Sequence, residues 1–354
     1  MAIRKLDVEN FRCLSQASLE LDDRYNLILG SNGAGKTSVL EAIYLLGSGH
    51  SFRTLPNNLL IKSGASSLMS VGKVSHRHGD LSTLGIRVTR EASEYRLNGE
   101  RAKSVGELAR EFPVQVIDPD IHDLVEGSPA ERRRFIDWGV FHVEHQFHEV
   151  WRRFNRALKQ RNASLRNGIV NSAIWDAEIC SQGSLVTAWR ESYLRSLRPF
   201  VNQLGTQLLS REVDFEFQPG WRRSISLIDA LEENKQRDLA RSTTSVGPHR
   251  AELLVTVDGN PAKERVSRGQ QKLLACALTL AQQLHRVSIG APATSLLLDD
   301  PAAELDVDNL GKLLEAISDL PVQLVVTALS DVGLDFMKNA KVFHVEHGTV
   351  KAMA

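Results

Sequence analysis

A glycine-rich stretch that begins at residue 30 has the residue types and spacing of a phosphate-binding loop. Glycines let backbone N–H groups converge on a phosphate, and a lysine adds positive charge. We expect Lys36 to reach the β- and γ-phosphates of ATP or GTP, and Thr37 to bind Mg²⁺. The predicted phosphate loop consists of Gly30, Ser31, Asn32, Gly33, Ala34, Gly35, Lys36 and Thr37.

A pair of aspartates follows an apolar run near the other end of the chain. A site that hydrolyses nucleotide needs a carboxylate at the end of a buried strand to hold Mg²⁺. Asp299, after the leucines at 296–298, fits that role. Asp300 is the expected catalytic residue, because a carboxylate beside the γ-phosphate can accept a proton from the attacking water. Most of the chain separates Asp299 from Lys36, so the sequence predicts a large insertion between two halves of one site.

A third motif opens an apolar helix shortly before the aspartates. Its serine suits a helix N-cap, and its glycine leaves backbone amides bare, so the helix end attracts anions. Nothing in the neighbouring sequence supplies an anion, and taken alone the motif is better explained as an ordinary capped helix. The four residues are Ser267, Arg268, Gly269 and Gln270.

The elements that must position these motifs are strands at both ends of the chain and helices in the middle. Residues 1–110 are mostly strand-like, and Asn98-Gly99 predicts a hairpin turn. Ser128, Pro129 and Glu131 are typical of a helix start with a capping box. The runs 296–300 and 322–326 are typical of strands buried in a parallel sheet. We therefore predict an α/β nucleotide-binding head, residues 1–125 and 245–354, interrupted by a helical lobe, residues 126–244.

Charge is balanced over the whole chain and uneven along it. Lys plus Arg and Asp plus Glu both number 43 in 354 residues, which argues against a strongly basic nucleic-acid-binding tail. Residues 132–166, however, hold nine basic and three acidic side chains. A basic helix face of this kind either binds DNA phosphates or is simply solvated and ion-paired. The DNA-binding candidates are Arg132, Arg133, Arg152, Arg153, Arg156 and Lys159.

Other compositional features narrow the class of protein. The three cysteines lie far apart, so we expect neither a disulfide framework nor a zinc site, and no metal other than Mg²⁺. No apolar run has the roughly 18 residues that a membrane span requires, and residues 1–5 lack a signal-peptide pattern. We therefore expect a soluble protein of the cytoplasm.

The order of phosphate loop, helical insert, serine-led motif and paired aspartates resembles the ABC-type ATPase heads. Residues 267–270 are similar to the signature motif of that class. The resemblance implies that the signature of one subunit faces ATP held by another, so that ATP joins two heads. It implies an ABC/SMC/Rad50-like head with an antiparallel β part and an inserted helical lobe. The insert lacks the sustained heptads of a long coiled coil.

Further motifs, spread from end to end, resemble the RecF family of bacterial recombination mediators. They are Asn10-Phe11-Arg12, residues 37–44, Ser51-Phe52-Arg53-Thr54, residues 126–129, residues 132–135, Gly247-Pro248-His249-Arg250, residues 267–270 and residues 298–300 with Glu304-Leu305-Asp306. By position, the resemblance implies that Gln115 is the glutamine linking nucleotide to the lobe. It implies that Glu304, Leu305 and Asp306 form the loop near the second site of a dimer. Arg12 and Arg53 are further candidates on the nucleotide side, and Thr327 is a candidate for a sensing role.

The RecF resemblance also implies a function. It implies a slow, DNA-stimulated ATPase that uses ATP and Mg²⁺, and that closes as a homodimer on double-stranded DNA, at single-strand/double-strand junctions or gaps. It implies work with RecR and RecO in loading RecA at gaps and stalled forks, in DNA repair, replication and the SOS response, with the protein associated with the nucleoid and no membrane partner.

Two other functions remain open at the level of sequence. One is the ATPase subunit of an ABC transporter, which usually carries glutamate where this chain has Asp300. The other is a DNA clamp that binds ATP and never hydrolyses it.

Overall fold

The computed structural model describes residues 1–54, 56–76, 79–167, 173–292, 294–303, 305–330, 337 and 339–353. By their contacts these form two compact units. The first unit is Met1–Ile121 with Cys276–Ala354, and the second is His122–Ala275. In the sequence the second unit lies between the two segments of the first. It includes residues 245–275, which the sequence-based division assigned to the head.

An antiparallel sheet forms one part of the first unit, with strand order β2-β1-β4-β5-β6-β7. Its strands alternate between buried apolar residues and exposed ones, as expected for a sheet with one solvated face. The predicted hairpin at Asn98-Gly99 is confirmed, and both residues have positive φ (51° and 85°). The strands are β1 (Ala2–Phe11), β2 (Leu14–Glu20), β4 (Ser67–Ser75), β5 (Leu81–Thr89), β6 (Ser93–Leu97) and β7 (Glu100–Arg101).

The second sheet of this unit has the order β15-β14-β3-β13-β12-β8, and all its neighbours are parallel except the β14–β15 hairpin. The two predicted strands β12 and β13 are buried at every position, which explains their uninterrupted apolar runs. Strand β13 lies between β3, which precedes the phosphate loop, and β12, which ends at Asp299. The strands are β3 (Tyr25–Leu29), β8 (Val114–Ile117), β12 (Ser295–Asp299), β13 (Gln323–Ala328), β14 (Lys341–Glu346) and β15 (Thr349–Ala352).

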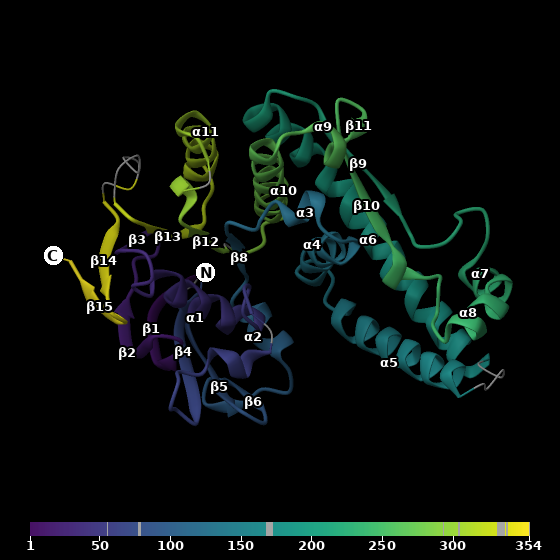
Figure 1. The fold of residues 1–354 in the computed structure, drawn as a ribbon, viewed down its shortest axis with the longest axis horizontal. Helices are drawn as coiled ribbons and strands as arrows, with labels where there is room; N and C mark the ends of the chain where they lie inside the picture. The colour runs from purple at the N-terminus through teal and green to yellow at the C-terminus, as the bar shows by residue number, and fades with distance from the viewer. Residues whose placement is uncertain are drawn as a thin grey trace. The chain divides into compact units, whose positions relative to one another are not determined.

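Helix α1 (Lys36–Ser48) joins the cores of both sheets (Figure 1). Val39, Leu40 and Ile43 pack in one apolar cluster with Leu6 of the antiparallel sheet and Val325 of the parallel one. The start of α1 is therefore held rigidly at the edge where the parallel strands end. The other helices wholly within this unit are η1 (Asn57–Leu60), α2 (Val105–Glu111), η3 (Pro301–Ala303) and α11 (Val307–Ser318).

The second unit combines helices with a small antiparallel sheet, β11-β10-β9, so the lobe predicted as helical also contains strands. Within it, α5 packs along α6 (Figure 1, teal). Helix α10 (Arg268–Ser288) crosses the division between the units. The elements of the second unit are α3 (Asp123–Glu126), α4 (Pro129–Phe141), α5 (Phe147–Arg166), α6 (Ala173–Leu209), β9 (Val213–Gln218), α7 (Leu227–Glu233), α8 (Lys235–Arg241), η2 (Pro248–Arg250), β10 (Glu252–Val257), β11 (Asn260–Pro261) and α9 (Ala262–Arg265).

Helix α4 begins where the sequence predicts, but its capping box is absent. Ser128 is the N-cap and Pro129 the first helical residue, yet the Ser128 side chain makes no cap hydrogen bond. Glu131 instead pairs with Arg134 on the exposed side of the helix. The proline accounts for this start, because its fixed φ suits the first turn.

A buried arginine ties together three helices of the lobe. Arg161 of α5 is 1 % exposed; its Nε donates to Asp176 of α6 at 2.6 Å, and its Nη1 donates to Asp238 of α8 at 2.7 Å. Asp238 has no exposed surface. Because buried charges are tolerated only when they are paired, this network fixes α5 relative to α6 and α8.

Candidate nucleotide site

The predicted phosphate loop joins the end of β3 to the start of α1. Gly35 has a φ of 118°, and a Cβ there would lie 2.8 Å from the Cys13 sulfur, so the position requires glycine. The Lys36 side chain is buried, and its Nζ donates to the carbonyls of Gly30 at 2.8 Å and Ser31 at 3.2 Å. The ammonium thus lies within the curve of the loop, beside the amides of the α1 N-terminus, where a phosphate would be bound.

Three residues from different elements meet at the carboxyl edge of the parallel sheet. The Thr37 hydroxyl donates to both Asp299 oxygens, at 2.9 and 3.0 Å. The Thr327 hydroxyl, at the end of β13, donates to Asp299 Oδ1 at 2.7 Å. Hydroxyl and carboxylate oxygens are the ligands that Mg²⁺ prefers, so Thr37 and Asp299 fit the predicted magnesium site. Thr327 orients the carboxylate from behind.

Asp300 lies beside this cluster in a constrained backbone conformation. Its φ is 47°, and its N–H donates to the Thr327 hydroxyl at 3.0 Å and to the Thr327 carbonyl at 3.2 Å. Burial raises the pKa of the Asp300 carboxyl; the neighbouring Asp299 raises it further, and Lys36 opposes them. A raised pKa makes this carboxylate a better proton acceptor, as the predicted catalytic role requires.

Asp118 is a further acidic residue at this edge that the sequence reasoning missed. It follows β8, which pairs in parallel with β12, as Asp299 ends β12. Burial raises its pKa to about 7, and Asp120 and Asp299 add to the shift. The signal was present in the sequence, since Val-Gln-Val-Ile-Asp repeats the pattern of apolar strand and terminal aspartate seen at residues 296–299.

Gln115 lies away from the carboxyl edge. It pairs with Leu296 across the sheet, three positions before Asp299, which is about 10 Å of strand. Its side chain is buried; Nε2 donates to Gln282 of α10 at 2.6 Å, and Oε1 accepts from Gln283. Both ends of the Gln115 amide are thus paired inside the protein, and its role in nucleotide binding stays a prediction.

Arg12 and Arg53 belong to one cluster around a buried carboxylate of α1. Arg12 donates to Glu41 through Nε at 3.2 Å and Nη2 at 2.9 Å, and Nη2 also donates to Thr54 at 2.7 Å. Ser51 donates to Glu41 at 2.5 Å. Arg53 is exposed on the same turn, and its N–H donates to the Ser51 hydroxyl. Arg12 is therefore committed to internal partners, whereas Arg53 faces solvent.

The predicted signature residues form the exposed first turn of α10. The Gln270 N–H donates to the Ser267 hydroxyl at 3.4 Å, and the Ser267 N–H donates to Gln270 Oε1 at 3.0 Å, which is a reciprocal capping box. Residues 267–270 are exposed, and residues 271–280 are all buried. A Cβ built on Gly269 would meet nothing within 4 Å, so nothing in the described chain requires this glycine.

The loop predicted to lie near the second site of a dimer is only partly described. Glu304 lies outside the described residues. Asp306 is the exposed N-cap of α11, where Oδ1 accepts from the Asn309 N–H at 2.8 Å and Oδ2 accepts from the Asn309 side chain. Leu305, just before it, is partly buried.

The six DNA-binding candidates separate into two groups. Arg132 is buried and donates to both Glu252 oxygens, at 2.7 and 2.8 Å, and to two carbonyls, which leaves it no surface for a phosphate. Arg133 donates to the Ala251 carbonyl, and burial together with Arg190 lowers its pKa.

The other four candidates are exposed on α5. Arg153 is paired with Glu178. Arg152, Arg156 and Lys159 are exposed on α5, and no described residue pairs with them.

Comparison with known proteins gives consistent matches along the whole chain. Residues 2–351 match the family described as "RecF/RecN/SMC N terminal domain". A protein of Thioalkalivibrio sulfidiphilus named DNA replication and repair protein RecF is 38 % identical, with 99 % of each chain covered. A protein of the same name from Haemophilus influenzae (strain 86-028NP) is 36 % identical, with each chain covered in full.

Two solved structures define the similarity in fold. A structure titled as the recombination mediator protein RecF-ATP in the RecFOR pathway has a TM-score of 0.89 at 23 % identity, covering 100 % of this chain and 98 % of the other. An Smc head bound to the C-terminal winged-helix domain of ScpA has a TM-score of 0.61 at 19 % identity, covering 100 % and 97 %. The fold is therefore that of an SMC-type ATPase head, as the sequence predicted. None of the described helices is long and apolar enough to span a membrane.

Proposed function

The chain belongs to the RecF family, and on this premise we propose that it is an ATP-driven, DNA-binding switch of recombination. Two copies close on double-stranded DNA when ATP binds, and slow hydrolysis reopens them. The observation that carries the proposal is the network in which Thr37, Asp299 and Thr327 meet beside Lys36 and Asp300. A site that binds and hydrolyses a magnesium–nucleotide complex needs these groups close together.

Each residue of the site has a distinct role in this proposal. Lys36 and the loop amides bind the phosphates, and Thr37 and Asp299 hold Mg²⁺, which when bound offsets charge on the phosphate oxygens. Asp300 accepts the proton of the attacking water, helped by its raised pKa. Thr327 positions both the Asp299 carboxylate and the Asp300 backbone, because its hydroxyl donates to the first and accepts from the second.

The signature residues act on the nucleotide of a second copy. Their exposure and their reciprocal cap support this role, because they form an ordered helix start at the surface. The open space around Gly269 supports it too, since the missing side chain matters only to a group from outside the described chain. The functional unit is then a homodimer with two composite ATP sites.

DNA binds along α5 in this proposal. Arg152, Arg156 and Lys159 are spaced four and three residues apart, so they share one helix face. Replacing all three by glutamine should reduce the slope of log affinity against log salt by about 2 to 3, since each phosphate contact contributes about 0.9. A matched triple variant of exposed residues in the first unit, Lys73, Arg87 and Arg90, should leave the slope unchanged. Equal slopes for the α5 variant and the wild type would exclude this face.

Our proposal for the biological setting is based on the relatives rather than on the geometry. The names of the relatives and of the solved structure include DNA replication and repair, a recombination mediator and the RecFOR pathway. We propose that this protein acts in the cytoplasm at the nucleoid, with RecO and RecR, to help load RecA at single-strand gaps and stalled forks.

Two variants test the ATP switch. Asp300→Asn should bind ATP, form dimers that persist and lose hydrolysis, because it keeps the shape of the side chain and removes the proton acceptor. Unchanged phosphate release would exclude Asp300 as the catalytic residue. Ser267→Arg should bind ATP as a monomer but fail to dimerise, and dimers that form normally would reject the signature role. A protein that dimerises with ATP and shows no hydrolysis in the wild type is instead the non-catalytic clamp.

A further inference from the structure

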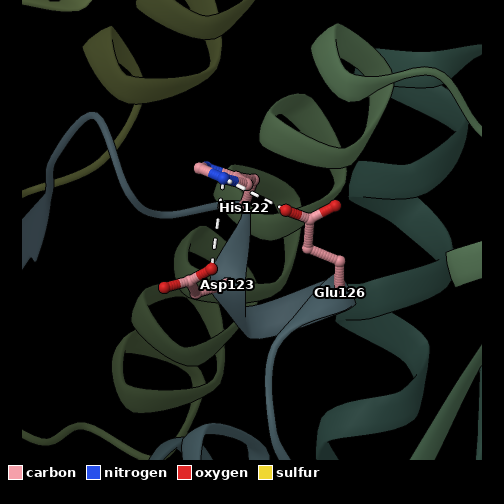
Figure 2. Close-up of side chains that lie close together, drawn as sticks. All are labelled: His122, Asp123 and Glu126. Carbon is pink, nitrogen blue, oxygen red and sulfur yellow. Dashed lines mark ion pairs between the residues drawn. The ribbon is translucent and has the colours of Figure 1, made fainter.

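A buried histidine lies next to the signature motif. His122 is 5 % exposed and occupies the N-cap position of α3. Its Nε2 lies 3.3 Å from Glu126 Oε1 and 4.0 Å from Asp123 Oδ1. Figure 2 shows both carboxylates directed toward the imidazole. Burial of the ring fixes where this nitrogen points.

The same nitrogen contacts the second residue of the signature. Arg268 Nη2 lies 3.4 Å from His122 Nε2, and both residues belong to the second unit. Within the described parts of the chain, this is the one polar side-chain partner of Arg268, whose side chain is otherwise exposed. The guanidinium of Arg268 and the carboxylates of Asp123 and Glu126 therefore lie within 4.0 Å of one ring nitrogen, and their opposite charges attract one another.

Two chemical interpretations of this cluster compete. The ligand atoms of His122, Asp123 and Glu126 lie close enough together to hold a metal ion. A guanidinium 3.4 Å from the nitrogen that would be the ligand opposes a second cation there. The arrangement is better explained as a cluster that holds the Arg268 guanidinium.

We propose that His122 is a positioning residue for the signature, acting through Arg268; the proposal rests on the signature role proposed above. The Ser267–Gln270 cap fixes the backbone of the first turn of α10, and a first turn otherwise frays because its N–H groups lack partners. The contact between Arg268 and the buried ring anchors the same turn by a side chain. It thereby sets the direction in which Ser267 and Gly269 meet the partner's nucleotide.

The test uses a pair of variants at position 122. His122→Phe keeps the ring packing and removes the polar contact with Arg268, whereas His122→Gln keeps a polar group at a similar reach. In sedimentation velocity with MgATP, His122→Phe should raise the dissociation constant of the dimer by about tenfold for each composite site. This is the effect of losing one hydrogen bond to a charged group. His122→Gln should stay within about threefold of the wild type. ATP binding to the monomer should be the same in all three proteins.

Arg268→Met supplies the second arm, with Arg265→Met as its control, because Arg265 is an exposed arginine three residues earlier. Arg268→Met should weaken dimerisation as His122→Phe does, and the double variant should be no worse than either single one. Additive losses, or dimerisation of His122→Phe equal to the wild type, would overturn the proposal. A wild type that stays monomeric with MgATP refutes the signature role itself, and the positioning role falls with it.

Discussion

Replacing Thr327 by valine removes one hydroxyl from the centre of the site and preserves the shape of the side chain. Thr327 has no exposed surface, and its hydroxyl donates to Asp299 at 2.7 Å while accepting from the Asp300 N–H at 3.0 Å. In the variant, Asp299 keeps its contact with Thr37, and the Asp300 N–H keeps the Thr327 carbonyl at 3.2 Å. The change therefore removes the bond that orients Asp299 from behind, together with one of the two acceptors of the Asp300 N–H.

The size of the effect follows from the charge of the acceptor. A hydrogen bond to an ionised group contributes about 1.5–3 kcal/mol, so the free energy of unfolding should fall by about that amount. Loss of a partner that orients a metal ligand typically weakens metal affinity about 10- to 100-fold. Because Thr327 touches Asp299 and neither the phosphate loop nor Lys36 in any described contact, the loss should fall on the magnesium-dependent part of ATP binding.

Calorimetric titration of ATP, with Mg²⁺ and with a chelator, separates the two parts. Thr327→Val should raise the Kd for ATP about 10- to 100-fold with Mg²⁺ and leave it unchanged without Mg²⁺. Thr294→Val is the matched control: Thr294 is 1 % exposed, accepts from Arg286 at 3.2 Å and precedes β12 at its opposite end. The control should lower stability without changing either Kd. Equal losses with and without Mg²⁺, or none, would refute the positioning of Asp299 by Thr327.

Three further predictions follow from other parts of the structure. Lys36→Ala should weaken ATP binding at least about tenfold in the same titration, because it removes a charged donor from the loop; unchanged affinity would reject the phosphate-loop assignment. In chemical unfolding, Arg161→Met should lower the free energy of unfolding by about 3–5 kcal/mol, because it leaves buried carboxylates without their partner. Arg153→Met, which breaks an exposed ion pair, should lower it by less than about 1 kcal/mol; similar decreases would contradict the buried network. The pKa of Asp118 is raised from 3.8 to about 7, so the folded state binds the proton more tightly than the unfolded state, and its contribution to stability is lost as pH rises through about 7. Asp118→Asn should therefore flatten the pH dependence of unfolding between these values without Mg²⁺, and an unchanged slope would exclude the shifted carboxyl.

Features that depend on contiguous sequence could be predicted, and those that depend on distant partners could not. A candidate phosphate loop can be recognised because its chemistry needs fixed spacing within eight residues. Strands β12 and β13 were predicted because full burial leaves unbroken apolar runs. The contacts of Thr327 could not be predicted from the sequence, since they depend on β13 lying between β3 and β12. The order of strands in a sheet is set by long-range pairing and cannot be read from the residues around Thr327.

Two of the predicted site residues have partners inside the protein that the sequence does not reveal. Arg132 belongs to a run of three arginines, and only the fold shows that its guanidinium pairs with Glu252, far along the chain. Gln115 alternates with valines, and only packing shows that its amide faces glutamines of α10. In both cases a polar residue that suits solvent or ligand in the sequence is satisfied inside the protein.

The central claim is that one copy supplies the phosphate loop and the other supplies the signature. It is tested most directly by mixing two inactive variants, Lys36→Ala and Ser267→Arg, and measuring ATP hydrolysis and dimerisation in the presence of DNA. In a mixed dimer, the loop of the Ser267→Arg copy faces the signature of the Lys36→Ala copy, so one of the two composite sites is intact. We predict that each variant alone is inactive and that the mixture regains hydrolysis and ATP-dependent dimers. A mixture as inactive as its separate components would contradict the account.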